Sequence, residues 1–90
     1  MKLQIGENIL LICREIEETS WTEKQWADAE SGDWFQYNDT IGGYNADERA
    51  FLLSYYDPEG EWWFQFSLAD VPKILSGEME YVKLSVPKRY

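Results

Sequence analysis

The chain has no histidine and only one cysteine among its 90 residues. The lack of histidine excludes Ser-His-Asp and Cys-His nucleophilic machinery, and it removes the commonest general base near neutral pH. It also removes most zinc and other transition-metal sites. Cys13 cannot form an internal disulfide, and a lone thiol is typical of a reducing compartment. We therefore expect a cytoplasmic protein that is not an enzyme and needs no cofactor and no metal.

Basic residues are also scarce, with 8 against 17 acidic ones and a formal net charge of −9. Direct binding to a nucleic-acid backbone needs a basic surface, so we do not expect it. No apolar run approaches the 18 residues of a transmembrane helix. Residues 1–7 lack both the apolar run and the small-residue cleavage site of a signal peptide. We therefore expect no contact with a membrane.

The residues that are abundant are sufficient for one hydrophobic core. Apolar residues make up 44% of the chain and aromatic residues 17%. A length of 90 residues predicts a single domain over 1–90. The order of helical and extended patterns predicts an α+β fold with two N-terminal helices, an antiparallel sheet of three to four strands that includes a central hairpin, and a short helix before the last strand.

The first helix is predicted over residues 8–18. Ile9, Ile12, Cys13 and Ile16 follow the i, i+3, i+4, i+7 spacing of one helical face. A strand is the alternative, because a short apolar run is ambiguous by periodicity alone. Cys13 lies inside this run and is interpreted as a small buried hydrophobic residue.

The start of the second helix carries a clear signal. Thr22 and Gln25 have the spacing of a capping box, in which each side chain binds the backbone N–H at the other's position. Trp21 and Trp26 stand at the two positions of a hydrophobic staple. An earlier register with Ser20 as the cap stays open.

Gly32 is a natural residue to follow a helix, so the second helix is predicted over 23–31. Residues 33–37 are aromatic-rich and predict a short strand or an extended segment. Residues 38–45 contain Asn, Asp and the pair Gly42-Gly43, which together predict the main loop with a glycine turn of positive φ. Neither register of an EF-hand calcium loop fits this region, and no lysine follows the glycine pair as in a phosphate loop.

A β-hairpin is predicted from residues 49–56 and 61–67, joined by a turn over 57–60. Pro58 and Gly60 suit a type I turn. Alternation predicts that one face of the hairpin packs against the helices and that Trp63 lies on the opposite face. The residues expected on the packed face are Phe51, Leu53, Tyr55, Trp62, Phe64, Phe66 and Leu68.

The C-terminal part is predicted to hold one short helix and one strand. Asp70 is the expected N-cap, with Pro72 in the first turn, where a missing N–H is harmless. Gly77 is expected to end this helix. The last strand is predicted over 79–86.

The negative charge is concentrated in one part of the sequence. Residues 7–61 contain 14 acidic and 3 basic residues, whereas residues 62–90 contain 3 acidic and 4 basic ones. Such a field attracts a basic partner and speeds association. The residues expected to bind the partner are Asp28, Glu30, Asp33, Asp39 and Asp47, with Tyr37 and Tyr44 as aromatic anchors beside the glycine pair.

In size, acidity and aromatic content, including the aromatic-rich segments 31–36 and 61–66, the chain resembles the small acidic immunity proteins of bacterial toxin–immunity systems. The resemblance implies a compact, non-catalytic protein that neutralises a toxin, often a nuclease with a basic active site, by direct binding. It further implies a basic protein partner and a monomer or weak dimer.

Two other functions stay open. A phage-encoded mimic of nucleic acid, such as an anti-restriction or anti-CRISPR inhibitor, is also small and acidic. Mimicry needs carboxylates at phosphate-like spacing, whereas the acids here form short clusters, with Glu15, Glu17 and Glu18 the densest. The third possibility is a small regulatory domain.

Overall fold

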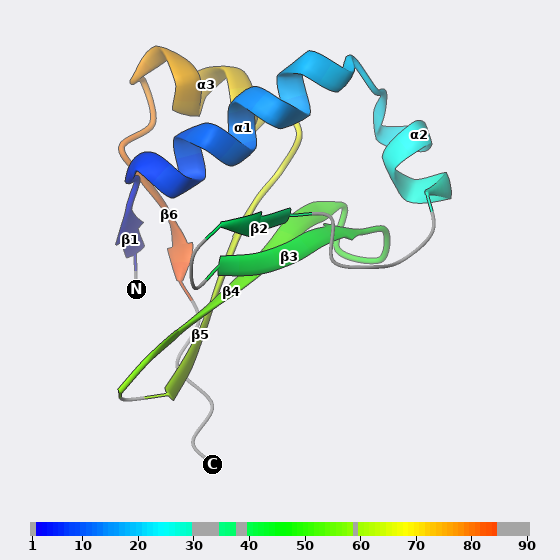
Figure 1. The fold of residues 1–90 in the computed structure, drawn as a ribbon. Coiled ribbons are helices and arrows are strands. Elements are labelled where there is room, and N and C mark those ends of the chain that lie inside the picture. Colours follow the sequence, from blue (N-terminus) through cyan, green and yellow to red (C-terminus); the bar gives the residue numbers. More distant parts are fainter. Residues whose placement is uncertain (1, 30–34, 38–39, 59, 85–90) are drawn as a thin grey trace.

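The computed structural model of the chain describes residues 2–29, 35–37, 40–58 and 60–84. The elements are β1 (Lys2–Gln4), α1 (Glu7–Thr19), α2 (Glu23–Asp28), β2 (Phe35–Tyr37), β3 (Thr40–Asn45), β4 (Ala50–Asp57), β5 (Gly60–Phe66), α3 (Asp70–Ser76) and β6 (Tyr81–Leu84) (Figure 1). The α+β class predicted from the sequence is confirmed.

The strands form one antiparallel sheet in the order β1-β6-β5-β4-β3-β2. The described residues thus contain six strands, and the prediction of three to four was too low. Strand β1 was missed because its three residues contain one apolar side chain. Strand β3 was missed because it contains the glycine pair.

The chain passes from β1 at one edge of the sheet to β2 at the other through α1 and α2, so these helices must cross the sheet. All three helices lie on the same side of the sheet (Figure 1). There α1 contacts α3, and α2 contacts β3. Within the described ranges, no helix has both the length and the apolar character needed to span a membrane.

Helix α1 is confirmed, and its strand alternative is excluded. Ile9, Ile12, Cys13 and Ile16 are buried, which is the face that the spacing predicted. Burial is the main cause that raises the pKa of the Cys13 thiol to about 12, and the carboxylates of Asp70 and Glu17 add to it. The thiol therefore stays protonated at neutral pH, and Cys13 acts as a small hydrophobic residue.

The start of α2 is also confirmed. Thr22 accepts a hydrogen bond from the Gln25 backbone N–H, and the Gln25 side chain accepts one from the Thr22 N–H. The rings of Trp21 and Trp26 pack with centroids 4.6 Å apart, as expected of a staple. The predicted end was wrong: α2 stops at Asp28, because Ala29 adopts an extended conformation. Gly32 lies outside the described residues.

Ser20 ends α1 instead of starting α2. Its φ of 56° is left-handed, and its N–H donates to the Glu17 carbonyl at 3.2 Å. A residue other than glycine in this conformation costs about 1 kcal/mol or more. We therefore expect Ser20→Gly to raise the free energy of unfolding by about 1 kcal/mol, measured by urea denaturation. At Gly77, which ends α3 with a φ of 84°, alanine should have the opposite effect. Equal stability of both variants and the wild type would contradict this expectation.

Residues 40–45 form strand β3, so the prediction of a loop over 38–45 was wrong for them; residues 38 and 39 lie outside the described residues. Gly42 pairs with Leu53, and Gly43 pairs with Leu52. Neither glycine has a positive φ, so the predicted glycine turn does not form. Gly42 is instead required by close approach, since a Cβ there would lie 2.6 Å from the Cα of Leu53.

The central hairpin formed by β4 and β5 is confirmed, with Asp57 paired to Gly60 across the turn. Phe64 and Phe66 are buried as predicted, whereas Trp62, expected to be buried with them, is half-buried. Trp63 pairs with Ser54 and, by strand alternation, lies on the face opposite Phe64 and Phe66, as predicted. The core cluster comprises Ile9, Ile12, Cys13, Ile16, Trp26, Phe35, Phe51, Leu53, Phe64, Phe66, Val71, Ile74 and Val82.

The C-terminal elements are found close to their predicted places. Asp70 is the first residue of α3 and not its N-cap, and its carboxylate accepts the Ser67 N–H at 2.9 Å. Gly77 ends α3 as predicted. The last strand covers Tyr81–Leu84, which is shorter than the predicted 79–86; residues 85 and 86 lie outside the described residues.

Candidate functional site

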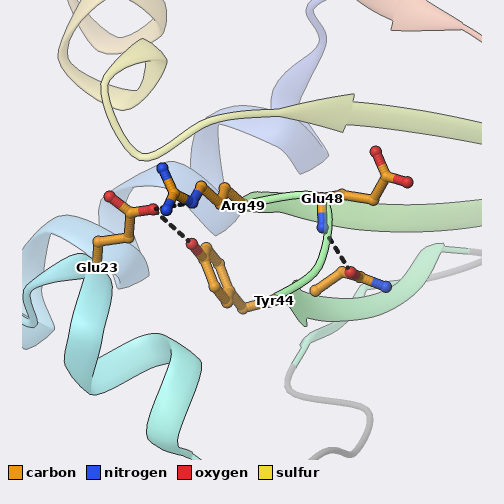
Figure 2. Close-up of polar contacts among 5 residues, drawn as sticks. Glu23, Tyr44, Glu48 and Arg49 are labelled. Carbon is orange, nitrogen blue, oxygen red and sulfur yellow. Dashed lines mark hydrogen bonds and ion pairs between the residues drawn. The ribbon is translucent and has the colours of Figure 1, made fainter.

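A polar cluster joins α2 to the turn between β3 and β4 (Figure 2). The Tyr44 hydroxyl donates to Glu23 Oε1 at 3.5 Å, and Arg49 Nε lies 3.6 Å from the same oxygen. Both distances exceed those of strong charge-assisted hydrogen bonds, which are about 2.7–2.9 Å. The side chains of Arg49 and Glu23 are 82% and 54% exposed, so this ion pair contributes only about 0–1 kcal/mol.

The turn itself fixes the position of Arg49. The Asn45 side chain accepts the Glu48 N–H at 2.9 Å (Figure 2). Arg49 then adopts a φ of 53°, the left-handed conformation that often closes hairpin loops and that glycine favours. For a residue other than glycine, this left-handed conformation is unfavourable by roughly 1–2 kcal/mol. The fold thus holds a basic side chain against Glu23 in spite of this cost.

Tyr44 is half-buried, with its ring packed against the core and its hydroxyl at the cluster. The ring centroid lies 5.1 Å from that of Phe51 and 6.5 Å from that of Trp26. Burial is the first cause that raises the pKa of the Tyr44 phenol, and the Glu23 carboxylate adds to it. The phenol therefore remains a neutral hydrogen-bond donor near neutral pH.

Tyr37 makes a similar contact with the other N-terminal helix. Its hydroxyl donates to Glu15 Oε2 at 2.6 Å, which links edge strand β2 to α1. This hydrogen bond is the first cause that raises the pKa of the Tyr37 phenol, and the nearby Glu18 carboxylate also contributes. Both predicted aromatic anchors thus have rings packed against the core and a hydroxyl beside a carboxylate.

The acidic residues predicted to bind a partner are only partly described. Asp28 is exposed at the end of α2, and Asp47 is exposed in the turn between β3 and β4. Glu30, Asp33 and Asp39 lie outside the described residues. Asp47 and Tyr44 belong to the same β3–β4 hairpin, and Asp28 lies on the helix that supplies Glu23.

Three exposed carboxylates, those of Glu15, Glu18 and Glu23, lie near the two tyrosines, and three more are exposed on α2 and on the β3–β4 turn. We call this set the acidic surface, and it comprises Glu15, Glu18, Glu23, Asp28, Asp47 and Glu48. Within the described part of the chain, only Glu23 among these six is in an ion pair. The same part of the chain holds no cluster of three or more acidic or cysteine side chains arranged to bind a metal ion. The acidic surface therefore presents negative charge outward.

A cleft of about 390 Å³ lies between α2 and the turn. Its walls are polar as well as apolar, and they are formed by Glu23, Lys24, Ala27, Tyr44, Ala46 and Arg49. The cleft is open to solvent, and the Glu23 carboxylate and the Tyr44 hydroxyl meet in its wall (Figure 2). The cleft thus places one carboxylate, that of Glu23, beside the two basic side chains of Lys24 and Arg49.

Glu15, Glu23 and Arg49 were not among the residues predicted to bind a partner. Glu15 lies 22 positions from Tyr37, and Glu23 lies 21 positions from Tyr44. No local pattern connects residues so far apart, because their contact depends on how α1 and α2 cross the sheet. The positive φ of Arg49 also leaves no signal in its own residue type.

Comparisons with protein-family models, with curated proteins and with solved structures find no match to this chain. Its function has to be inferred from the chemistry of its own residues.

Proposed function

We propose that this protein is a non-catalytic binding protein whose acidic surface docks onto a basic protein, and that it acts as an immunity protein by blocking a toxin. The observation that carries the proposal is the acidic surface itself. It has six exposed carboxylates, three of them near the two tyrosines, and within the described residues only Glu23 among the six is ion-paired. A net charge of −9 adds a long-range field of the same sign.

The two tyrosines support a docking role because their rings are held before any partner arrives. Tyr44 packs on Phe51 and Trp26, and Tyr37 packs against the core. Aromatic side chains that are already ordered lose little conformational freedom on binding, and tyrosine is enriched among residues that dominate interface energies. The carboxylates around them supply steering and selectivity for a basic surface.

A toxin that binds nucleic acid fits this chemistry. Its active site must attract phosphates, so it presents basic side chains that an acidic surface also attracts. Docking there would exclude the substrate without any reaction by the inhibitor. We further propose a cytoplasmic location, in keeping with the single thiol, and a monomer or weak dimer.

The steering role predicts a salt-dependent association rate. The partner is first captured from the source organism on the immobilised protein and identified by mass spectrometry; its association with the purified protein is then measured by surface plasmon resonance. In the double variant Asp28→Lys/Asp47→Lys, we expect the association rate at low salt to fall about tenfold or more, because steering accelerates association by 10–1,000-fold. The difference should shrink at high salt, where screening acts.

The control is Glu78→Lys/Glu80→Lys, which makes the same change in charge at exposed residues between α3 and β6. It should reduce the association rate much less. An equal loss in both double variants would show that total charge matters and that the binding face lies elsewhere. The captured partner should also lose its own activity when one equivalent of the wild-type protein is added, and full activity of the complex would contradict the inhibitory role.

A further inference from the structure

The cleft between α2 and the β3–β4 turn has the components of a binding site for a basic side chain. Glu23 supplies the one carboxylate of the lining, next to the basic Lys24, and Tyr44 supplies a hydroxyl directed at that carboxylate (Figure 2). The volume of about 390 Å³ falls within the usual range of ligand pockets, roughly 300–1,000 Å³. The Tyr44 ring is available to contact the methylene groups of an inserted side chain.

The guanidinium already near Glu23 is loosely bound. Arg49 reaches one carboxylate oxygen through Nε at 3.6 Å, which is an ion pair without a hydrogen bond. An arginine bound most strongly to a carboxylate makes two parallel hydrogen bonds of about 2.7–2.9 Å. Since Arg49 is anchored in a turn at a φ of 53°, its approach to Glu23 is set by the backbone as well as by the charge.

We propose that this cleft receives an arginine side chain of the basic partner, and that Arg49 acts as an internal substitute that this side chain displaces. The inference rests on the proposed function, because it names the contact through which the acidic surface recognises its partner. Arg49 is 82% exposed, so its side chain is able to swing into solvent when displaced. The displaced Arg49 then lies at the rim of the interface, where it repels a partner that brings a basic residue to the wrong place.

The test uses a nona-arginine peptide as the probe, with affinity measured by fluorescence anisotropy at low salt. Removing the internal guanidinium by Arg49→Gly should tighten binding about fivefold, the factor by which a competing exposed ion pair of ~1 kcal/mol weakens it. Glycine also suits the left-handed φ at this position. Arg49→Asn, which tolerates the same conformation, is the second variant in case the first alters folding.

Two further variants separate the cleft from the effect of charge alone. Arg14→Gln removes one positive charge from the exposed part of α1 and should tighten binding by less than Arg49→Gly. Glu23→Gln should weaken binding, and in that background Arg49→Gly should have no larger effect than Arg14→Gln. Such non-additivity is expected of groups that compete for the same carboxylate.

The outcomes distinguish the inference from the function on which it rests. If the wild type binds the peptide and Arg49→Gly and Arg14→Gln have equal effects, the cleft is not the arginine site, while a basic partner for the acidic surface stands. If Glu23→Gln leaves the effect of Arg49→Gly intact, the displacement mechanism is wrong. If the wild type does not bind the peptide at low salt, the proposed function fails together with the inference.

Discussion

Replacing Phe51 with alanine is expected to lower the free energy of unfolding by about 3–5 kcal/mol. Phe51 is fully buried in the centre of the sheet. Its ring packs against Trp26 from α2 at 5.2 Å, against Tyr44 at 5.1 Å and against Phe66 at 5.4 Å. Alanine removes these contacts and leaves a cavity between the helical layer and the sheet. Small domains are stable by only about 5–15 kcal/mol, so this single change removes a large part of the total.

The measurement is urea denaturation followed by tryptophan fluorescence and by circular dichroism, and the control is Tyr81→Ala. Tyr81 is a large aromatic residue on a strand of the same sheet, but it is 44% exposed. Its loss should cost less than about 1 kcal/mol, as is usual for surface substitutions. A loss of stability in Phe51→Ala no larger than that in Tyr81→Ala would contradict the central role of this ring.

Phe51 also connects the core to the candidate site. The same ring that fills the core supports Tyr44, whose hydroxyl lies beside Glu23. The position of that hydroxyl is therefore set by packing, and it does not depend on a flexible loop. We expect mutations in this part of the core to weaken partner binding as well as stability.

Those features of the fold that depend on neighbouring residues were predictable from the sequence. The capping box of Thr22 and Gln25 and the staple of Trp21 and Trp26 involve residues within five positions of each other, and both are present. The apolar face of α1 and the hairpin turn at 57–60 are local patterns of the same kind. In each case the signal is carried by residues close together in the sequence.

Features that depend on partners far away in the sequence were not predictable in this way. Strand β3 forms because β4 pairs with it along its whole length, which overrides the tendency of glycine and asparagine to form turns. The contacts of Glu15 with Tyr37 and of Glu23 with Tyr44 likewise follow from the crossing of α1 and α2 over the sheet.

Gly42 illustrates this difference. Glycine is common in turns, but at this position it is required because two strands approach closely. An ideal Cβ on Gly42 would overlap the carbonyl oxygen of Leu52 and would lie 2.6 Å from Leu53 Cα and 2.9 Å from Leu53 Cγ. The first two of these atoms belong to the backbone of β4 and cannot move without disturbing the ladder. The glycine therefore permits the close approach of two strands and not a turn.

We expect Gly42→Ala to lower the free energy of unfolding by at least about 3 kcal/mol, because inserting atoms into a packed core commonly costs 1–3 kcal/mol and more where backbone must shift. The strain should also displace β3, which carries Tyr44, so partner binding should weaken in whatever fraction of the variant stays folded. The stability is measured by urea denaturation, and the disturbance of the β3–β4 ladder by amide hydrogen exchange, where Leu53 and its neighbours should lose protection.

The matched control is Gly6→Ser, which places a Cβ in open space, since no atom lies within 4 Å of that position. Gly6 precedes α1 without a side-chain cap, and serine there should keep the stability or raise it by a few tenths of a kcal/mol. If Gly42→Ala proves as stable as Gly6→Ser, with unchanged exchange at Leu53, then β3 and β4 do not approach each other so closely in solution. The register that places Tyr44 beside Glu23 would then have to be determined again, because the same strand pairing sets both.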